Sequence, residues 1–405
     1  MISNGIVLVT TLIMLSVLFS SKVRLSPEWR ATVTPLASII GSGFLVSAPL
    51  LILSTGKLAP IAMLVIVMLA YGIGCSIRYN IMNFEPLIGS GESKLSKTIF
   101  WESLSAPVLG LAYIISVAFY LKLLSAFALR GFGLSSVFIE NSLTTCLLLF
   151  IGITGKVRGL SMLESLETYS VNTKLAIIVA LIVGHIVFNF SLMANGEWTL
   201  LVYPHEGPAV VIRKLLGVLI IIQGFETSRY MGHAYNRPTR VKTMRYAQVI
   251  SGVIYVIFIS STLTAFNNIH TLGETTVIDV CRTIAPVLPW LLIIAALMSQ
   301  FSAAVADTIG SGGLLAEASC QKVSVNGSYL MITFIGVMLT WVTDIYAIIT
   351  IASKAFAVYY AIQIAVTISL LRLEAKTIGR LAKMIGFAIL FILMVLVVLF
   401  GIPIE

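Results

Sequence analysis

The chain has 405 residues, of which 58% are hydrophobic and only 11% are charged, and its formal net charge is +9. A soluble protein of this length needs far more polar surface, so the mean hydropathy of +1.02 predicts an integral membrane protein. Because the positive charges lie in short loops between apolar runs, we expect no nucleic-acid partner. The four cysteines show neither metal-binding nor Cys-x-x-Cys spacing, and we expect no cofactor and no metal.

Windows of about 20 apolar residues predict twelve membrane-spanning helices. Of the 26 Lys and Arg residues, 19 fall in loops on one side of these spans, 6 fall on the other side, and Lys354 lies within a span. The positive-inside rule makes the richer side cytoplasmic, so both termini are predicted to lie outside, in a multi-pass protein of the cell (cytoplasmic, or inner) membrane. The predicted spans are 5–20, 32–53, 59–78, 99–128, 138–155, 171–193, 210–231, 245–267, 289–317, 326–343, 345–371 and 384–402.

The predicted spans divide the chain into five parts. Residues 1–31 form an extra transmembrane helix, which nothing basic precedes and which we therefore interpret as an uncleaved anchor, and a cytoplasmic linker. The second span enters the membrane from the cytoplasm and the seventh enters it from outside. Residues 32–193 and 210–371 are therefore predicted to be two five-helix repeats of inverted topology. An extracellular linker, 194–209, joins the repeats, and 372–405 contains the last transmembrane helix.

Glycines interrupt the first helix of each predicted repeat. Gly41 and Gly43 lie in the apolar stretch 39–44, and Gly224 lies in the stretch 222–227. A helix in lipid must satisfy its own backbone hydrogen bonds, so a break is tolerated only against protein or a watery cavity. Paired breaks in corresponding halves point to the substrate site of an inverted-repeat transporter. The alternative is that these glycines only allow close helix packing.

The backbone groups freed at the two breaks are predicted to bind opposite charges. N–H groups near a half-helix N-terminus at the first break favour a carboxylate, and free carbonyl groups at the second break accept hydrogen bonds from an ammonium group. Together they would recognise the main-chain atoms of an α-amino acid, a small-molecule substrate. The predicted substrate-binding residues are Ile40, Gly41, Ser42, Gly43, Ile222, Gln223, Gly224, Phe225, Glu226 and Lys354.

Four short motifs follow one another from the second to the eleventh span. They are Gly41-Ser42-Gly43-Phe44 with Pro49, Thr173-Lys174-Leu175-Ala176, Gly224-Phe225-Glu226 with Asn236-Arg237-Pro238-Thr239-Arg240, and Tyr359-Tyr360 with Leu370-Leu371-Arg372. In this order the chain resembles the amino acid–polyamine–organocation (APC) superfamily. The resemblance implies an all-α, 5+5 inverted-repeat transporter fold with discontinuous first and sixth core helices. The chain departs from the pattern at Gly232-His233-Ala234, where acidic residues are usual, and in having one extra helix on each side of the core.

Ionisable residues inside membrane spans are costly and are therefore functional candidates. The resemblance implies that Lys174 takes the place of a sodium ion, so transport would be sodium-independent and either proton-coupled or an exchange. We expect Asp307 to pair with Lys174 or to bind an ion or proton together with Thr308. Lys354 is predicted to contact an anionic group of the substrate or to pair with Glu226. The alternatives are a flanking lysine for Lys174, a watery vestibule for Asp307, snorkelling for Lys354 and a cytoplasmic ion pair for Glu226.

The predicted function is secondary active transport of amino acids by alternating access. The chain contains no Gly-x-x-x-x-Gly-Lys-Ser/Thr signature for ATP, and no His-Glu-x-x-His or Gly-x-Ser-x-Gly motif that would favour an intramembrane enzyme. Polyamines or other organic cations are the alternative substrates. A membrane ligand sensor that does not transport is the alternative from another class of protein.

Overall fold

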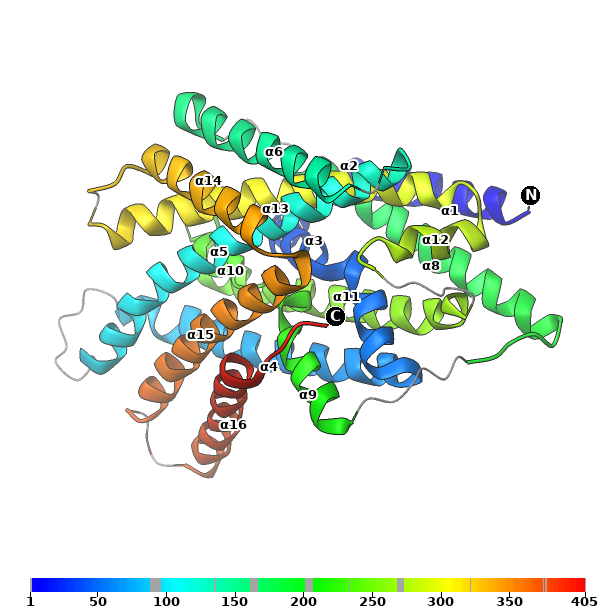
Figure 1. The fold of residues 1–405 in the computed structure, drawn as a ribbon. Helices are drawn as coiled ribbons and strands as arrows, with labels where there is room; N and C mark the ends of the chain where they lie inside the picture. Colours follow the sequence, from blue (N-terminus) through cyan, green and yellow to red (C-terminus); the bar gives the residue numbers. More distant parts are fainter. Residues whose placement is uncertain are drawn as a thin grey trace.

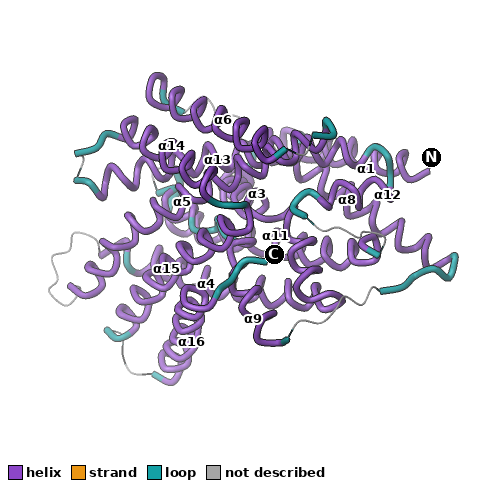
Figure 2. Tube along the Cα trace, viewed as in Figure 1, coloured by secondary structure: helices purple, strands orange, loops and turns teal. Residues whose placement is uncertain are grey.

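The computed structural model describes residues 2–87, 96–134, 136–160, 167–200, 207–232, 234–267, 273–320, 322–373, 375 and 377–404, and this part consists of helices and the loops between them (Figures 1 and 2). The elements are α1 (Ile2–Leu18), α2 (Ser21–Arg24), α3 (Pro27–Thr55), η1 (Gly56–Leu58), α4 (Ala59–Asn83), η2 (Glu85–Leu87), α5 (Ser96–Gly131), α6 (Val137–Arg158), α8 (Glu167–Ala194), α9 (Pro208–Gly217), η4 (Leu219–Ile222), α10 (Thr227–Tyr230), α11 (Arg237–Thr262), η5 (Leu263–Phe266), α12 (Thr276–Ile284), α13 (Leu288–Ala318), α14 (Val325–Val342), α15 (Ile345–Leu371) and α16 (Ile378–Phe400).

The helices coincide with the predicted spans. Within the described residues, nine segments are long and apolar enough to cross a membrane; one of them, Pro27–Leu87, contains both α3 and α4. The first predicted span corresponds to the shorter apolar helix α1, and the seventh corresponds to α9, η4 and α10. The boundaries of the two repeats stay a prediction.

Several helices begin at polar side chains that cap their first turn. The Asn236 side chain accepts a hydrogen bond from the Thr239 N–H at 3.0 Å, and Pro238 occupies the first turn of α11. The Asp344 side chain accepts from the Ala347 N–H at 2.9 Å at the start of α15. Because these caps satisfy N–H groups that have no partner within the helix, they explain why the chain re-enters a helix at these positions.

The long helix α5 runs through the middle of the molecule and packs against both α13 and α15, and α3 packs against α8, α11, α13 and η4 (Figure 1). The predicted extra helices lie outside this core, where α1 packs on α8 and α16 packs on α15. Only Met394 and Val397 of α16 are buried, as expected for a helix that faces lipid.

The prediction of a break in α3 is wrong. The helix is continuous from Pro27 to Thr55, so the N–H groups near Gly41 and Gly43 are part of a regular helix. The physical reason lies in packing: a Cβ atom on Gly43 would stand 2.6 Å from the Cα atom of Ile221, the residue that precedes the second break. Glycine here lets α3 approach the interrupted helix at backbone distance, which is the alternative reading of the glycine pair.

The predicted break in the seventh span is confirmed. The α-helix α9 stops at Gly217, a 3-10 turn follows as η4, the chain leaves helical geometry at Gln223 and Gly224, and α10 begins at Thr227. Gly224 has φ +114°, a backbone conformation that residues with a Cβ atom rarely adopt.

We expect Gly43→Ala to lower the free energy of unfolding by about 1–3 kcal/mol, the usual cost of overpacking, because the new methyl group meets Ile221 backbone. Gly386→Ala in α16 is the control, because a Cβ atom there meets nothing within 4 Å. Melting temperatures of the purified variants test this. Equal melting temperatures for the two variants would contradict close backbone packing at Gly43.

Candidate functional site

The break between η4 and α10 is held by groups that replace its lost helical hydrogen bonds. The Gly224 N–H donates to Glu226 Oε2 at 2.9 Å, and the Thr227 hydroxyl donates to the Gly224 carbonyl oxygen at 2.7 Å. A Cβ atom on Gly224 would lie 2.6 Å from the Cβ atom of Ser38 on α3. Glycine is required here by its φ angle and by this contact, and Glu226 caps the break from within the chain.

Neighbouring helices supply further hydrogen bonds to the break. The Tyr255 hydroxyl of α11 bridges two carbonyl oxygens, those of Ile39 at 2.9 Å and Ile221 at 2.8 Å. The Gln223 side chain donates through Nε2 to the Tyr120 hydroxyl of α5, and the Tyr360 hydroxyl of α15 donates to Glu226 Oε2 at 2.9 Å. The interrupted segment is therefore bonded to α3, α5, α11 and α15.

The middle of α3 also receives side-chain donors, although its helix is unbroken. Lys174 Nζ donates to the Ala37 carbonyl oxygen at 2.8 Å, and Gln300 Nε2 donates to the Gly41 carbonyl oxygen at 2.9 Å. The Ile39 carbonyl oxygen accepts from Tyr255, as described above. Every second carbonyl group from residue 37 to residue 41 therefore has a hydrogen-bond donor from another helix. Each of these carbonyl oxygens has two lone pairs, so it can accept from a neighbouring side chain while α3 remains a continuous helix.

A cavity of about 380 Å³ runs to the break between α3, α5, α10 and α13. Exposed residues, among them Tyr230 and Glu317, line its rim, and the buried Tyr113 and Asp307 line its deep end. The rim lies at the end of the bundle that the Lys and Arg distribution predicts to be cytoplasmic. This volume is in the range of small-molecule sites. The remaining lining residues are Thr34, Thr227, Met231, Ala306, Ile309, Gly310, Gly313 and Leu314.

The deep end of the cavity is acidic. Asp307 is 1% exposed and lies within hydrogen-bonding reach of the Tyr120 hydroxyl, the same hydroxyl that accepts from Gln223. Asp307 Oδ2 has no hydrogen-bond partner within the described residues. Glu226, fully buried, lies close enough to Asp307 for the two carboxyl groups to interact electrostatically. A buried oxygen without a donor is costly, so this end of the cavity is suited to a ligand that donates hydrogen bonds or carries positive charge.

On the opposite side of the break the packing is closed. The centroid of the Phe44 ring lies 4.4 Å from that of the Phe258 ring and 5.5 Å from that of the Tyr255 ring. The space around Lys174 and Ile40 on this side amounts to only about 10 Å³. Among the described residues, the cavity therefore opens toward its rim, and the packing on the opposite side of the break leaves little space around Lys174 and Ile40.

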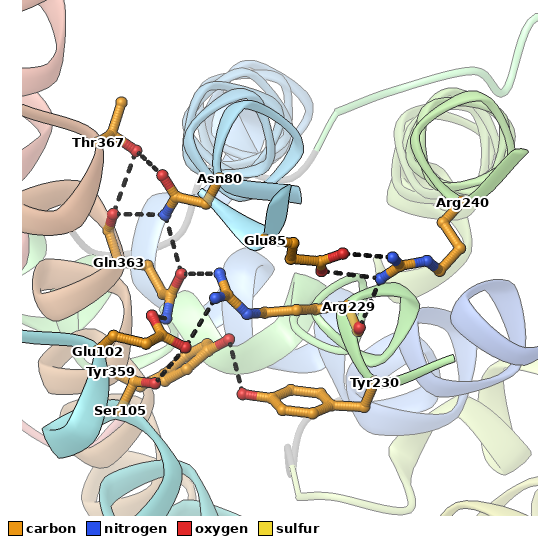
Figure 3. Close-up of polar contacts among 10 residues, drawn as sticks. All are labelled: Asn80, Glu85, Glu102, Ser105, Arg229, Tyr230, Arg240, Tyr359, Gln363 and Thr367. Carbon is orange, nitrogen blue, oxygen red and sulfur yellow. Dashed lines mark hydrogen bonds and ion pairs between the residues drawn. The ribbon is translucent and has the colours of Figure 1, made fainter. Parts of the chain in front are cut away.

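A polar network anchors α10 at the end of the bundle where the cavity has its rim (Figure 3). Arg229, 7% exposed, pairs with Glu102 of α5 at 2.7 Å and donates to Gln363 Oε1 of α15. The Arg229 carbonyl oxygen accepts from Arg240 of α11, which forms two hydrogen bonds with Glu85. Figure 3 also shows that the network extends through Asn80 to Thr367 and through Tyr230 to Tyr359.

Comparison with known proteins identifies the family. A family described as APC superfamily transporters matches residues 21–401. The chain belongs to the APC superfamily. A relative from Aquifex aeolicus (strain VF5), described as an uncharacterized protein, is 44% identical to this APC transporter over 381 residues, which are 93% of this chain and 91% of the relative.

Solved structures agree with the fold of this APC transporter. Mhp1, a nucleobase-cation-symport-1 family transporter in a closed conformation, superposes with a TM-score of 0.54 at 9% identity over 91% of this chain and 90% of its own. A mutant of the Eremococcus coleocola manganese transporter superposes with a TM-score of 0.51 at 11% identity over 90% of this chain and 85% of its own. These similarities confirm the predicted inverted-repeat transporter fold, with the correction for α3.

The structure brings some of the predicted site residues of this APC transporter together. Gln223 bonds to the Tyr120 hydroxyl, Glu226 lies close enough to Asp307 for an electrostatic interaction, and Gly224 provides the break. Phe225 is buried and stacks on Tyr360 with ring centroids 5.3 Å apart, and Ile222 is buried at the end of η4. The Thr308 hydroxyl bonds to the Ala304 carbonyl oxygen of its own helix, and the Ser42 side chain lies outside the described part.

Two predicted pairings are wrong. Besides Ala37, Lys174 bonds to the Ser299 hydroxyl at 3.3 Å, and Ser299 lies eight residues before Asp307, about 12 Å along α13. Lys354 is half-buried and lies six residues before Tyr360, the partner of Glu226; at about 100° per residue the two side chains lie about 120° apart around α15, so Lys354 is on another face. Helix periodicity therefore separates both lysines from the acidic end of the cavity.

Four tyrosines near the break were not predicted to be site residues, and of these only Tyr360 belonged to a sequence motif. Tyr113 and Tyr120 lie seven residues apart, two turns on one face of α5, and Tyr255 and Tyr360 come from α11 and α15. For Tyr113 and Tyr120 the sequence did contain a signal. Tyrosines repeated every seven residues within a membrane span indicate a helix face that has polar partners.

We expect Arg229→Met to lower the free energy of unfolding by about 1.5–3 kcal/mol, because it leaves the half-buried Glu102 carboxyl group without its charged partner. Lys242→Met is the control: it removes an ion pair with Glu28 whose side chains are 49% and 56% exposed, and such pairs contribute about 0–1 kcal/mol. Melting temperatures in detergent compare the two. A loss no larger for Arg229→Met than for Lys242→Met would contradict an anchoring role of the network.

Proposed function

We propose that this protein is a secondary active transporter of a small organic solute that carries a positively charged nitrogen. The observation that supports this is the cavity that ends at Asp307 beside the interrupted helix. The carboxyl groups of Asp307 and Glu226 and the Tyr120 hydroxyl form an acceptor-rich end for an ammonium group. The class of transporter follows from the family, and the nature of the substrate is the proposal.

Organic cations are the first substrate candidates. The residues that line the described cavity include the carboxylates Asp307 and Glu317 and no Lys, Arg or His, which suits a cation without a carboxylate. The N–H groups that were predicted to bind a carboxylate are within the regular helix α3. The described conformation therefore supports recognition of the amine and gives no support for recognition of a carboxylate.

Amino acids are the second candidates, and the shared carbonyl groups of α3 favour them. Ala37, Ile39 and Gly41 already bond to side chains of other helices, so α3 loses less when it opens at this point. Such an opening would release the N–H groups near Gly43 for a substrate carboxylate. Substrate binding and a local opening of α3 would then occur together.

We expect a cationic substrate to raise the melting temperature of the purified protein by mass action, and Asp307→Asn to abolish the shift because the amide cannot neutralise an ammonium group. The ligand set is putrescine, agmatine, the twenty amino acids and a nucleobase set. Lys354→Ala is the control, because Lys354 lies on another face of α15, and it should keep the shift. A shift that persists in Asp307→Asn would contradict the proposed site, and shifts with nucleobases alone would contradict the substrate class.

Transport is expected to be independent of sodium. The Lys174 ammonium group is bonded to the Ala37 carbonyl oxygen and the Ser299 hydroxyl, two oxygen atoms of the kind that a sodium ion would otherwise bind. In proteoliposomes, uptake of the ligand that raises the melting temperature should be the same in sodium and choline buffers. It should respond to an imposed pH gradient or to internal substrate. Uptake that requires sodium would contradict this assignment of Lys174.

A further inference from the structure

The chain that follows α16 folds back onto the outer half of the interrupted helix. Helix α16 ends at Phe400, and residues 401–404, which we call the strap, run from it toward the middle of the molecule (Figure 1). The Ile402 N–H donates to the Arg213 carbonyl oxygen of α9 at 3.1 Å, and Arg213 Nε donates to the Phe400 carbonyl oxygen at 3.2 Å. The strap and α9 are therefore joined by hydrogen bonds in both directions.

Two glycines bring the strap and α9 to backbone contact. A Cβ atom on Gly217 would meet the Ile402 carbonyl group, with the carbonyl carbon only 2.9 Å away. A Cβ atom on Gly401 would in turn lie 3.3 Å from the Cα atom of Gly217. A side chain at Gly217 would clash with the strap, and one at Gly401 would be tightly packed against α9 and would meet the Val397 carbonyl oxygen at 2.8 Å.

The strap is also anchored by burial. Ile404 is 1% exposed and belongs to the main hydrophobic core, whereas most of α9 before Lys214 is exposed or half-buried. The strap thus attaches the buried end of α9 to α16, and α16 packs on α15. Gly217 lies seven residues before Gly224, so the attachment point is directly connected through η4 to the break.

We propose that the strap is a conformational restraint that holds α9 in the described position and so favours the conformation that is closed on the side of α9. Its consequence for transport rests on the proposed function, since alternating access requires the interrupted helix to move against α15. The strap acts on α9 as the Arg229 network acts on α10, from the other end of the same interrupted helix. Its loss would release α9 without disturbing the acidic end of the cavity.

The test is hydrogen–deuterium exchange of the purified full-length protein, which needs no substrate and therefore does not depend on the proposed function. Two variants remove the strap contact: Gly217→Ala, which introduces the clash with Ile402, and a chain ended after Gly401. Gly386→Ala is the matched control, because it lies in α16 with nothing within 4 Å of its Cβ position. We expect exchange of the amides in 208–222 to be about tenfold faster in both strap variants and unchanged in the control, with α5 and α13 protected as in the original protein.

Two outcomes would overturn the proposal. Unchanged exchange in 208–222 in both strap variants would show that the strap does not restrain α9. Equal acceleration in α9, α5 and α13 would show that the strap contributes only to global stability. Failure to find a transported substrate would bear on the proposed function and would leave the exchange result intact.

Discussion

The rest of the structure depends on one constraint: between Gln223 and Glu226 the backbone leaves helical geometry inside a membrane protein. Unsatisfied peptide groups there would cost several kcal/mol each. The protein satisfies them with Glu226 and Thr227 from the same segment and with Tyr255 from α11. Each of these partners must be held in place by its own helix, so the break determines how α3, α11 and α15 are arranged around it.

The two glycine-containing segments, which were predicted to be interrupted in the same way, have different structures and different roles. The segment at Gly224 is open and rich in carbonyl groups, whereas α3 stays helical and uses Gly43 to approach Ile221. The acidic end of the cavity lies beside the open segment. The asymmetry explains why the lining of the described cavity has carboxylate acceptors for a cation and no Lys, Arg or His for an anion.

The number of helices, their order and the break at Gly224 were predictable from sequence, because hydropathy, loop charge and glycine position are local signals. The partners of Lys174 were not, because Lys174 and Asp307 lie on helices whose vertical offset depends on packing and not on local sequence. Lys174 bonds to Ser299, which lies eight positions before Asp307 on α13, so the predicted pair does not form. Lys354 was predicted to face Glu226 and lies on another face of α15, since rotation about the helix axis is decided by contacts such as that of Tyr360 with Glu226. The tyrosine partners of the break are long-range contacts, for which a single sequence carries only a weak periodic signal.

The hydrogen bond from Arg213 to Phe400 joins residues that are 187 positions apart in the chain. During synthesis, α9 is therefore inserted into the membrane long before the segment that secures it has been made. Until α16 arrives, the outer half of the interrupted helix has to remain in the bilayer without its partner, and a folding intermediate with a loose α9 is expected at that stage. The interrupted helix is thus secured only after α16 has been made, so a chain that stops before α16 would lack the contact that holds α9.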